Sequence, residues 1–141
     1  VAMDDVYGGT FRLFERVRKS TASLSVTYAD LSDPEKFAAS ITPATKLVWI
    51  ETPTNPLLKI VDIAAIAAIA RKRGVIVGCD NTFASPYCQR PLDLGADIVM
   101  HSATKSLAGH SDVIGGVLVV KDKDLGERLQ FLQNSVGAIQ G

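Results

Sequence analysis

Apolar residues recur at intervals of three and four in several stretches of the chain, a spacing that predicts amphipathic helices. The predicted helices cover residues 10–19, 34–41, 63–73 and 124–135. Helix start signals support two of them, because Asp33 precedes Pro34 and Asp62 precedes the third apolar stripe. Gly74 supplies a stop signal for that third helix.

Shorter, almost uninterrupted apolar runs separate these helices and predict buried strands. The runs are residues 24–28, 46–51, 75–79, 98–100 and 114–120. Strands that alternate with helices in this way predict an α/β domain whose mostly parallel sheet is covered on both faces. No crossover helix is predicted between residues 100 and 114, so the last strand is expected to run antiparallel to its neighbours.

Composition narrows the class of protein. The chain has 141 residues, 47% of them hydrophobic, and a net charge of zero. This length suffices for one domain with a sizeable core, and the balanced charge argues against nucleic acid as a partner. No apolar run is long enough to span a membrane. Two cysteines are too few for a disulfide framework, and Cys79 falls in a predicted buried strand, so a reduced, cytoplasmic protein is expected.

A lone lysine, Lys105, follows the predicted strand at residues 98–100 in a polar setting. Ser102 and Thr104 stand just before it, and Gly109-His-Ser-Asp112 follows. Hydroxyls and loop amides bind phosphate oxygens, and an amine reacts with a carbonyl. A lysine after a strand is more often an ordinary surface residue, but these neighbours favour an anion-binding loop.

A second polar position strengthens this hypothesis. Asp80 follows the predicted strand at residues 75–79, and the carboxyl ends of parallel strands meet at one crevice. Asp80 and Lys105 are therefore expected to face the same crevice. A carboxylate for the pyridinium nitrogen and a Schiff-base lysine for the aldehyde are the protein groups that pyridoxal phosphate needs.

Two further stretches carry candidate binding residues. Glu51-Thr-Pro-Thr-Asn-Pro56 follows a predicted strand, and its two prolines favour a rigid loop in which Asn55 could donate to a cofactor oxygen, although a plain turn is the simpler interpretation. Tyr7 precedes a glycine pair at a predicted helix start and could stack on a flat ligand. An isolated tyrosine of this kind is more often a core residue.

Other enzyme classes fit less well. A nicotinamide-dependent oxidoreductase would need a Gly-x-Gly-x-x-Gly turn after a strand, and the sequence has none. A metal hydrolase would use His101, His110, Asp80 and Asp112, but the spacing of the two histidines is not typical of metal ligands. A binding module without catalytic activity stays open, although an intact lysine and aspartate argue against it.

Taken together and in order, these motifs resemble the pyridoxal-phosphate-dependent enzymes of Cys/Met metabolism, the cystathionine γ-lyases, γ-synthases and β-lyases and the methionine γ-lyases. The resemblance covers essentially all 141 residues. It implies the aspartate-aminotransferase-type fold (fold type I), with residues 1–141 as the central part of the large cofactor domain of a longer chain. The motifs are Tyr7-Gly-Gly-Thr10, Glu51-Thr-Pro-Thr-Asn-Pro56, Asp80-Asn-Thr-Phe83, Ser102-Ala-Thr-Lys105 and Gly109-His-Ser-Asp112.

The resemblance also implies a role for each matching residue. Lys105 would hold the cofactor aldehyde and shuttle protons, and Asp80 would pair with the pyridinium nitrogen. Tyr7 would stack on the ring and assist proton transfer. The remaining cofactor contacts would be Asn55 near the phenolic oxygen and Ser102 and Thr104 at the phosphate, with Glu51 and Thr82 behind them.

The activity implied is that of a cystathionine γ-lyase in transsulfuration, which would release cysteine, 2-oxobutanoate and ammonia from cystathionine. A γ-synthase acting on O-acyl-homoserine shares every residue named here and is the main alternative. Methionine γ-lyases and bacterial β-lyases match the glycine pair at residues 8–9 less well. The family resemblance further implies a homotetramer whose sites are completed across a dimer interface, with an amino acid as substrate and no metal.

Overall fold

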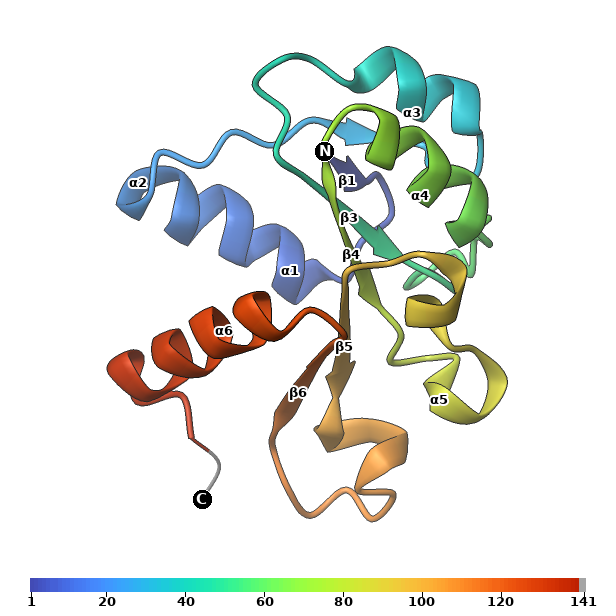
Figure 1. The fold of residues 1–141 in the computed structure, drawn as a ribbon. Helices are drawn as coiled ribbons and strands as arrows, with labels where there is room; N and C mark the ends of the chain where they lie inside the picture. Colours follow the sequence, from blue (N-terminus) through green and yellow to red (C-terminus); the bar gives the residue numbers. More distant parts are fainter. Residues whose placement is uncertain (140–141) are drawn as a thin grey trace.

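The computed structural model describes residues 1–139 and contains one six-stranded sheet (Figure 1). The strand order is β2-β1-β3-β4-β5-β6. Strands β1 to β5 pair in parallel wherever they are neighbours, and β6 runs antiparallel to β5. The strands are β1 (Ala2–Met3), β2 (Tyr28–Ala29), β3 (Leu47–Glu51), β4 (Ile76–Asp80), β5 (Ile98–Ser102) and β6 (Gly116–Val120).

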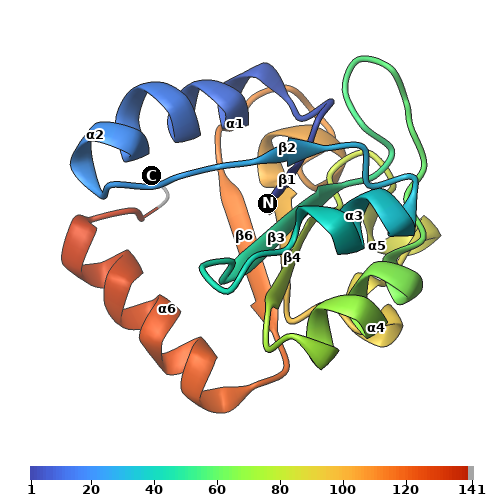
Figure 2. The same ribbon diagram turned by 90° about the horizontal axis from the view of Figure 1, so that it is seen from above.

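Helices cover both faces of this sheet, as Figure 2 shows from above. Helices α1, α2 and α6 lie on one side, and α3, α4 and α5 lie on the other. Two short π-helical segments and one 3-10 turn complete the set. The helical elements are α1 (Gly8–Arg12), η1 (Leu13–Arg18), α2 (Lys19–Thr21), α3 (Pro34–Ser40), α4 (Ile63–Lys72), α5 (Ser85–Cys88), η2 (Pro91–Leu94), η3 (Ala103–Leu107) and α6 (Lys123–Val136).

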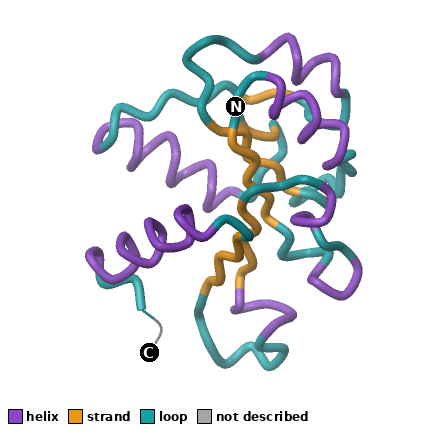
Figure 3. The backbone as a smooth tube through the Cα atoms, viewed as in Figure 1, coloured by secondary structure: helices purple, strands orange, loops and turns teal. Residues whose placement is uncertain are grey.

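The predicted α/β class and the antiparallel last strand are both confirmed. The tube view in Figure 3 shows the strands running through the centre of the molecule between helices and loops. The connection from β5 to β6 contains only the single turn η3, too short for a crossover to a parallel strand. The chain therefore turns back beside β5, and Ser102 pairs with Gly116 at the end of the ladder nearest this connection.

Local sequence signals explain where the long helices start. Asp33 accepts hydrogen bonds from the backbone N–H groups of Glu35 and Lys36, and Asp62 accepts one from Ala65. These side chains satisfy N–H groups that have no partner within their own helix. The apolar stripe of α4 is buried against the sheet, where it joins the core that includes Val77 and Cys79.

Four elements differ from their predicted boundaries by two residues or more. Strand β5 runs on to Ser102 instead of ending at Met100. The strand predicted at residues 24–28 is reduced to Tyr28–Ala29, because its partner β1 offers only two residues for pairing. The sixth strand begins at Gly116 rather than at Ile114, whose side chain is 92% exposed and lies in the preceding loop. The first helix is longer than predicted and continues from Gly8 through η1 to Thr21.

Within the described residues, no helix is long and apolar enough to cross a membrane.

Candidate functional site

Three neighbouring parallel strands end in polar residues at the same edge of the sheet. Strand β3 ends at Glu51, β4 at Asp80 and β5 at Ser102. Glu51 and Asp80 are register partners, and Asp80 is in turn paired with Met100, two residues before Ser102. The structure thus confirms that the Glu51, Asp80 and Lys105 motifs all leave the sheet at its carboxyl edge, where ligands bind in open α/β sheets.

Asp80 is a buried carboxylate whose orientation is fixed by its own loop. Only 6% of the residue is exposed, and its Oδ1 accepts a hydrogen bond of 2.9 Å from the backbone N–H of Thr82. The hydroxyl of Thr82 accepts a bond of 2.8 Å from the N–H of Ser102. Thr82 therefore ties the aspartate loop to the end of β5, where the lysine loop begins.

Lys105 opens onto a cleft of about 590 Å³. The cleft is formed by the loop between β5 and β6, and it brings Thr104 and Lys105 together with the Gly109–Asp112 stretch. The backbone of Lys105 is not helical (φ −96°, ψ −127°), so the turn η3 is kinked at this residue. Within residues 1–139 its amine makes no hydrogen bond or ion pair, so it is free to react.

The hydroxyl of Thr104 has a backbone partner across the same loop. It donates to the carbonyl of Gly115 at 3.3 Å and accepts from the N–H of Gly115 at 3.0 Å. A hydroxyl has one proton to donate. Thr104 would therefore have to release the Gly115 carbonyl before its hydroxyl could donate to a phosphate, a constraint that the sequence did not reveal.

Tyr7 and Asn55 lie on two loops that meet at Glu51. Tyr7 is the N-cap residue of α1 and is 52% exposed, so it is not the core tyrosine of the simpler interpretation. Its backbone N–H donates to Glu51 Oε2 at 2.9 Å. The backbone N–H of Asn55 also hydrogen-bonds the Glu51 carboxylate.

Further contacts between the same two loops escaped the sequence analysis. The carboxylate of Asp5 accepts from the Thr54 hydroxyl and, at 2.9 Å, from the backbone N–H of Leu57. Lys59 forms an ion pair of 2.9 Å with Asp4. The Tyr7 loop and the Asn55 loop are therefore held together as one unit by side chains from both.

Burial dominates the electrostatics of Glu51. Desolvation raises the pKa of Glu51 to about 7, and the nearby charges of Asp80 and Asp5 act in the same direction. Hydrogen bonds from the N–H groups of Tyr7 and Asn55 oppose this increase in the pKa. A buried carboxyl group whose pKa is strongly raised is a candidate for a functional site.

The cleft beside Lys105 contains only part of the predicted site. Thr104 and Lys105 line it, whereas Asp80, Tyr7 and Asn55 do not. These three stand on adjacent loops of the same edge, and whether the side chain of Asn55 faces Lys105 stays a prediction.

The two histidines behave as packed or loop residues. His101 lies in β5 and is 5% exposed, and burial lowers the pKa of its imidazole. His110 is exposed, with Nδ1 2.8 Å from the carbonyl oxygen of Ala108.

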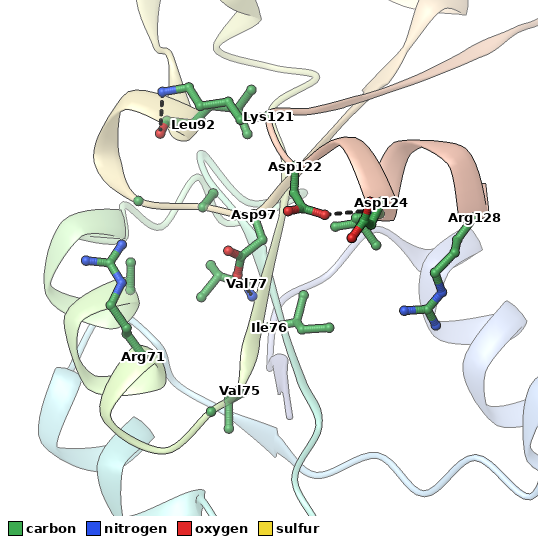
Figure 4. A pocket seen from close by; sticks show the side chains of 15 residues that line it. Arg71, Val75, Ile76, Val77, Leu92, Asp97, Lys121, Asp122, Asp124 and Arg128 are labelled. Carbon is green, nitrogen blue, oxygen red and sulfur yellow. Dashed lines mark hydrogen bonds between the residues drawn. The ribbon is translucent and has the colours of Figure 1, made fainter. Parts of the chain in front are cut away.

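A second cleft, of about 610 Å³, lies at the opposite edge of the sheet (Figure 4). Arg71 of α4 and Arg128 of α6 stand on opposite sides of it, with Asp97 between them. The carboxylate of Asp97 accepts a hydrogen bond of 2.8 Å from the N–H of Val77. The carboxylate of Asp122 caps α6 by accepting a hydrogen bond from the N–H of Leu125. This cleft lies at the amino ends of β4 and β5, away from Asp80 and Lys105, and is not the candidate site.

The residues at the carboxyl edge fit pyridoxal phosphate by their chemistry. A buried carboxylate at Asp80 suits a protonated ring nitrogen, and the exposed amine at Lys105, which has no partner among residues 1–139, suits an aldehyde. The hydroxyl of Ser102 suits a phosphate, and so does that of Thr104 once it releases the Gly115 carbonyl.

Comparisons with known proteins agree with this assignment. The chain is 57% identical to the cystathionine gamma-lyase of Mus musculus over 99% of its length and 35% of that protein. It is 59% identical to the cystathionine beta-lyase of Coxiella burnetii, over 99% of this chain and 36% of the relative. The cystathionine gamma-synthase of Mycobacterium tuberculosis is 53% identical over 100% of this chain and 36% of its own.

Solved structures share the fold. The cystathionine gamma-lyase of Lactobacillus plantarum, complexed with L-serine, superposes with a TM-score of 0.97 at 54% identity, covering 99% of this chain and 36% of that one. The chain thus spans just over a third of the length of these relatives. The profile of the Cys/Met metabolism PLP-dependent enzymes matches residues 1–141, and the chain belongs to this family of fold type I enzymes.

Proposed function

We propose that the full-length protein is a pyridoxal-phosphate-dependent cystathionine γ-lyase, and that residues 1–141 form the central part of its cofactor domain. The observation that carries this proposal is the placement of a buried Asp80 at the carboxyl end of β4 and of an exposed Lys105 just past the carboxyl end of the adjacent parallel strand β5. The coverage of just over a third of each relative supports the assignment to part of a longer enzyme.

In this proposal each residue has a defined task. Asp80 keeps the ring nitrogen protonated, so that the cofactor, when bound, supplies an acceptor for the electron pair left after the α-proton departs. Lys105 holds the cofactor and then carries a proton from the α- or β-carbon. Tyr7 would cover the ring, Asn55 would lie near the phenolic oxygen, and Ser102 and Thr104 would bind the phosphate.

The γ-elimination takes cystathionine and water to cysteine, 2-oxobutanoate and ammonia. A γ-synthase would begin from O-acyl-homoserine and form the Cγ–S bond to cysteine in place of the acyloxy group, which leaves as a carboxylate. The γ-synthase relatives support this second candidate, since they are nearly as similar as the γ-lyases. The β-lyase activity, which the glycine pair argued against, also stays a candidate because a protein of that name is 59% identical.

Product analysis of the full-length protein separates these candidates. With cystathionine alone, 2-oxobutanoate and cysteine identify the γ-lyase, whereas pyruvate and homocysteine identify the β-lyase. Cystathionine formed from O-acyl-homoserine and cysteine identifies the synthase. Absence of all these products, together with no visible absorption band on addition of pyridoxal phosphate, would favour a binding module.

We also propose a homotetramer in the cytoplasm, with each site completed by a neighbouring subunit across a dimer interface. The support is the family membership. Light scattering on the full-length protein tests the assembly, and a mass equal to one subunit would contradict it.

A further inference from the structure

The ring of Tyr7 folds back over Gly9, two residues further along the chain. A Cβ atom built on Gly9 would overlap the Tyr7 ring at Cε1, and would lie 3.0 Å from Cδ1 and 3.1 Å from Cζ. Real Cβ atoms very rarely approach other atoms this closely. The observed ring position therefore requires a residue without a side chain at position 9.

The neighbouring glycine does not share this constraint. A Cβ on Gly8 would meet only Arg12 Nη1, at an ordinary contact distance of 3.5 Å. Both glycines belong to the first turn of α1, and neither has the positive φ that disfavours other residues. Gly8 is thus a matched reference for any effect of Gly9 that comes from helix propensity alone.

The backbone of Tyr7 has little freedom to adjust. Its N–H is held by the buried carboxylate of Glu51 at 2.9 Å, and its carbonyl accepts from the N–H of Phe11 in α1. A side chain at position 9 would therefore be accommodated by rotation of the Tyr7 ring rather than by movement of its backbone.

We propose that Gly9 is a positioning residue for the ring of Tyr7: the missing side chain at Gly9 and the hydrogen bond from the Tyr7 N–H to Glu51 together fix where the ring stands at the site. The inference rests on the proposed function, in which Tyr7 covers the cofactor ring. It extends that function by assigning to Gly9 a role exerted entirely through Tyr7.

The test compares Gly9→Ala with Gly8→Ala in the full-length protein. Alanine is the better helix former, so both variants are expected to fold and to keep or slightly raise the melting temperature. Crystal structures of the cofactor-free variants should show the Tyr7 ring displaced in Gly9→Ala and unmoved in Gly8→Ala. This readout does not depend on the cofactor.

The second readout is cofactor binding. Visible circular dichroism of bound pyridoxal phosphate reports the asymmetric surroundings of its ring, and we expect it to change in Gly9→Ala alone. Loss of a stacking contact should weaken cofactor affinity about 2- to 10-fold, the range of aromatic pair contributions. Added to Tyr7→Ala, the Gly9→Ala change should cost nothing more, because its effect passes through the ring.

The outcomes separate the two proposals. A wild-type protein with no cofactor band overturns the proposed function, while the cofactor-free structures still decide the position of the ring. A Tyr7 ring in the same place in both glycine variants overturns the role of Gly9. So does an equal loss of affinity when Gly9→Ala is added to Tyr7→Ala.

Discussion

Glu51 and Asp80 are register partners on the parallel strands β3 and β4, and each is only 6% exposed. Two acidic side chains are thus buried next to one another at the edge of the sheet where the lysine loop begins. Their surroundings differ, because Glu51 accepts from the N–H of Tyr7 and Asp80 accepts from the N–H of Thr82. Glu51 therefore holds the loop that carries the ring of Tyr7, whereas Asp80 is held in place by the loop that follows it.

Glu51 should make stability depend on pH. Its pKa is raised from 4.5 to about 7 in the folded protein, so the folded state keeps a proton that the unfolded state loses between these values. Its stabilising contribution is therefore complete below about pH 4.5 and is lost as pH rises through about 7. One unit of pKa corresponds to about 1.4 kcal/mol, so the rise in the pKa of Glu51 sets an upper limit of about 3.5 kcal/mol.

The measurement is urea unfolding of the cofactor-free full-length protein between pH 5 and about 8, with Glu51→Gln beside the wild type. The glutamine keeps an acceptor for the N–H of Tyr7 but cannot ionise. We expect a flatter pH profile and a gain in stability over the wild type above pH 7. Parallel profiles for the two proteins would contradict the raised pKa of Glu51.

Lys105→Ala should abolish both the visible absorption band and turnover while the fold is retained. The Lys105 side chain is exposed and makes no hydrogen bond or ion pair within the described residues, so its removal costs little packing. Absorption spectra with added pyridoxal phosphate and far-ultraviolet circular dichroism provide the two readouts. A variant that keeps the cofactor band would show that another amine holds the cofactor.

Asp80→Ala should affect turnover more than substrate binding. In the proposed site Lys105 would still hold the cofactor, but the ring nitrogen would lose the charge that keeps it protonated, and the effect would appear where negative charge develops. We expect kcat to fall on the order of 100-fold or more, with a much smaller change in KM. Asp93→Ala is a suitable control, because Asp93 pairs with the exposed Lys121 outside the site. Normal turnover in Asp80→Ala would place the cofactor elsewhere.

Cys79 should resist alkylation in the folded protein. It is fully buried in β4, and burial together with the charges of Asp80 and Glu51 raises the pKa of its thiol to about 12. The thiolate is the reactive form, so iodoacetamide should modify Cys79 only after unfolding. Peptide mapping by mass spectrometry checks this, with Cys88 as an exposed thiol in the same chain. Rapid modification of Cys79 under native conditions would contradict the burial.

Much of this fold was predictable because its signals are local. The caps at Asp33 and Asp62 and the short connection before β6 are all set by residues close in sequence. Strand β1 was missed because two residues carry no periodic pattern. The strand predicted at residues 24–28 was too long, since apolar character alone does not supply a pairing partner.

The candidate site was likewise predictable only where its signals are local in sequence. The sequence placed Asp80 and Lys105 at one edge because each follows its own strand, and the strands are neighbours. The brace between Asp5 and Thr54 spans 49 residues, and the bond from Tyr7 to Glu51 spans 44. Contacts between residues so far apart in sequence produce no periodic pattern along the chain. They can be identified only from the three-dimensional structure, in which the two loops lie side by side.

The antiparallel pairing of β5 with β6 has a consequence for how this site can change. Ser102 and Gly116 are the last pair of residues in the antiparallel ladder of β5 and β6. The residues between them, Lys105 included, form the loop that connects the two strands. Insertions or deletions in a hairpin end need not disturb the register of the strands behind it. A change of length between residues 106 and 114 would therefore leave the pairing of β5 with β6 intact, although it would remove contacts to Lys105 itself, whose carbonyl accepts from the N–H of Gly109.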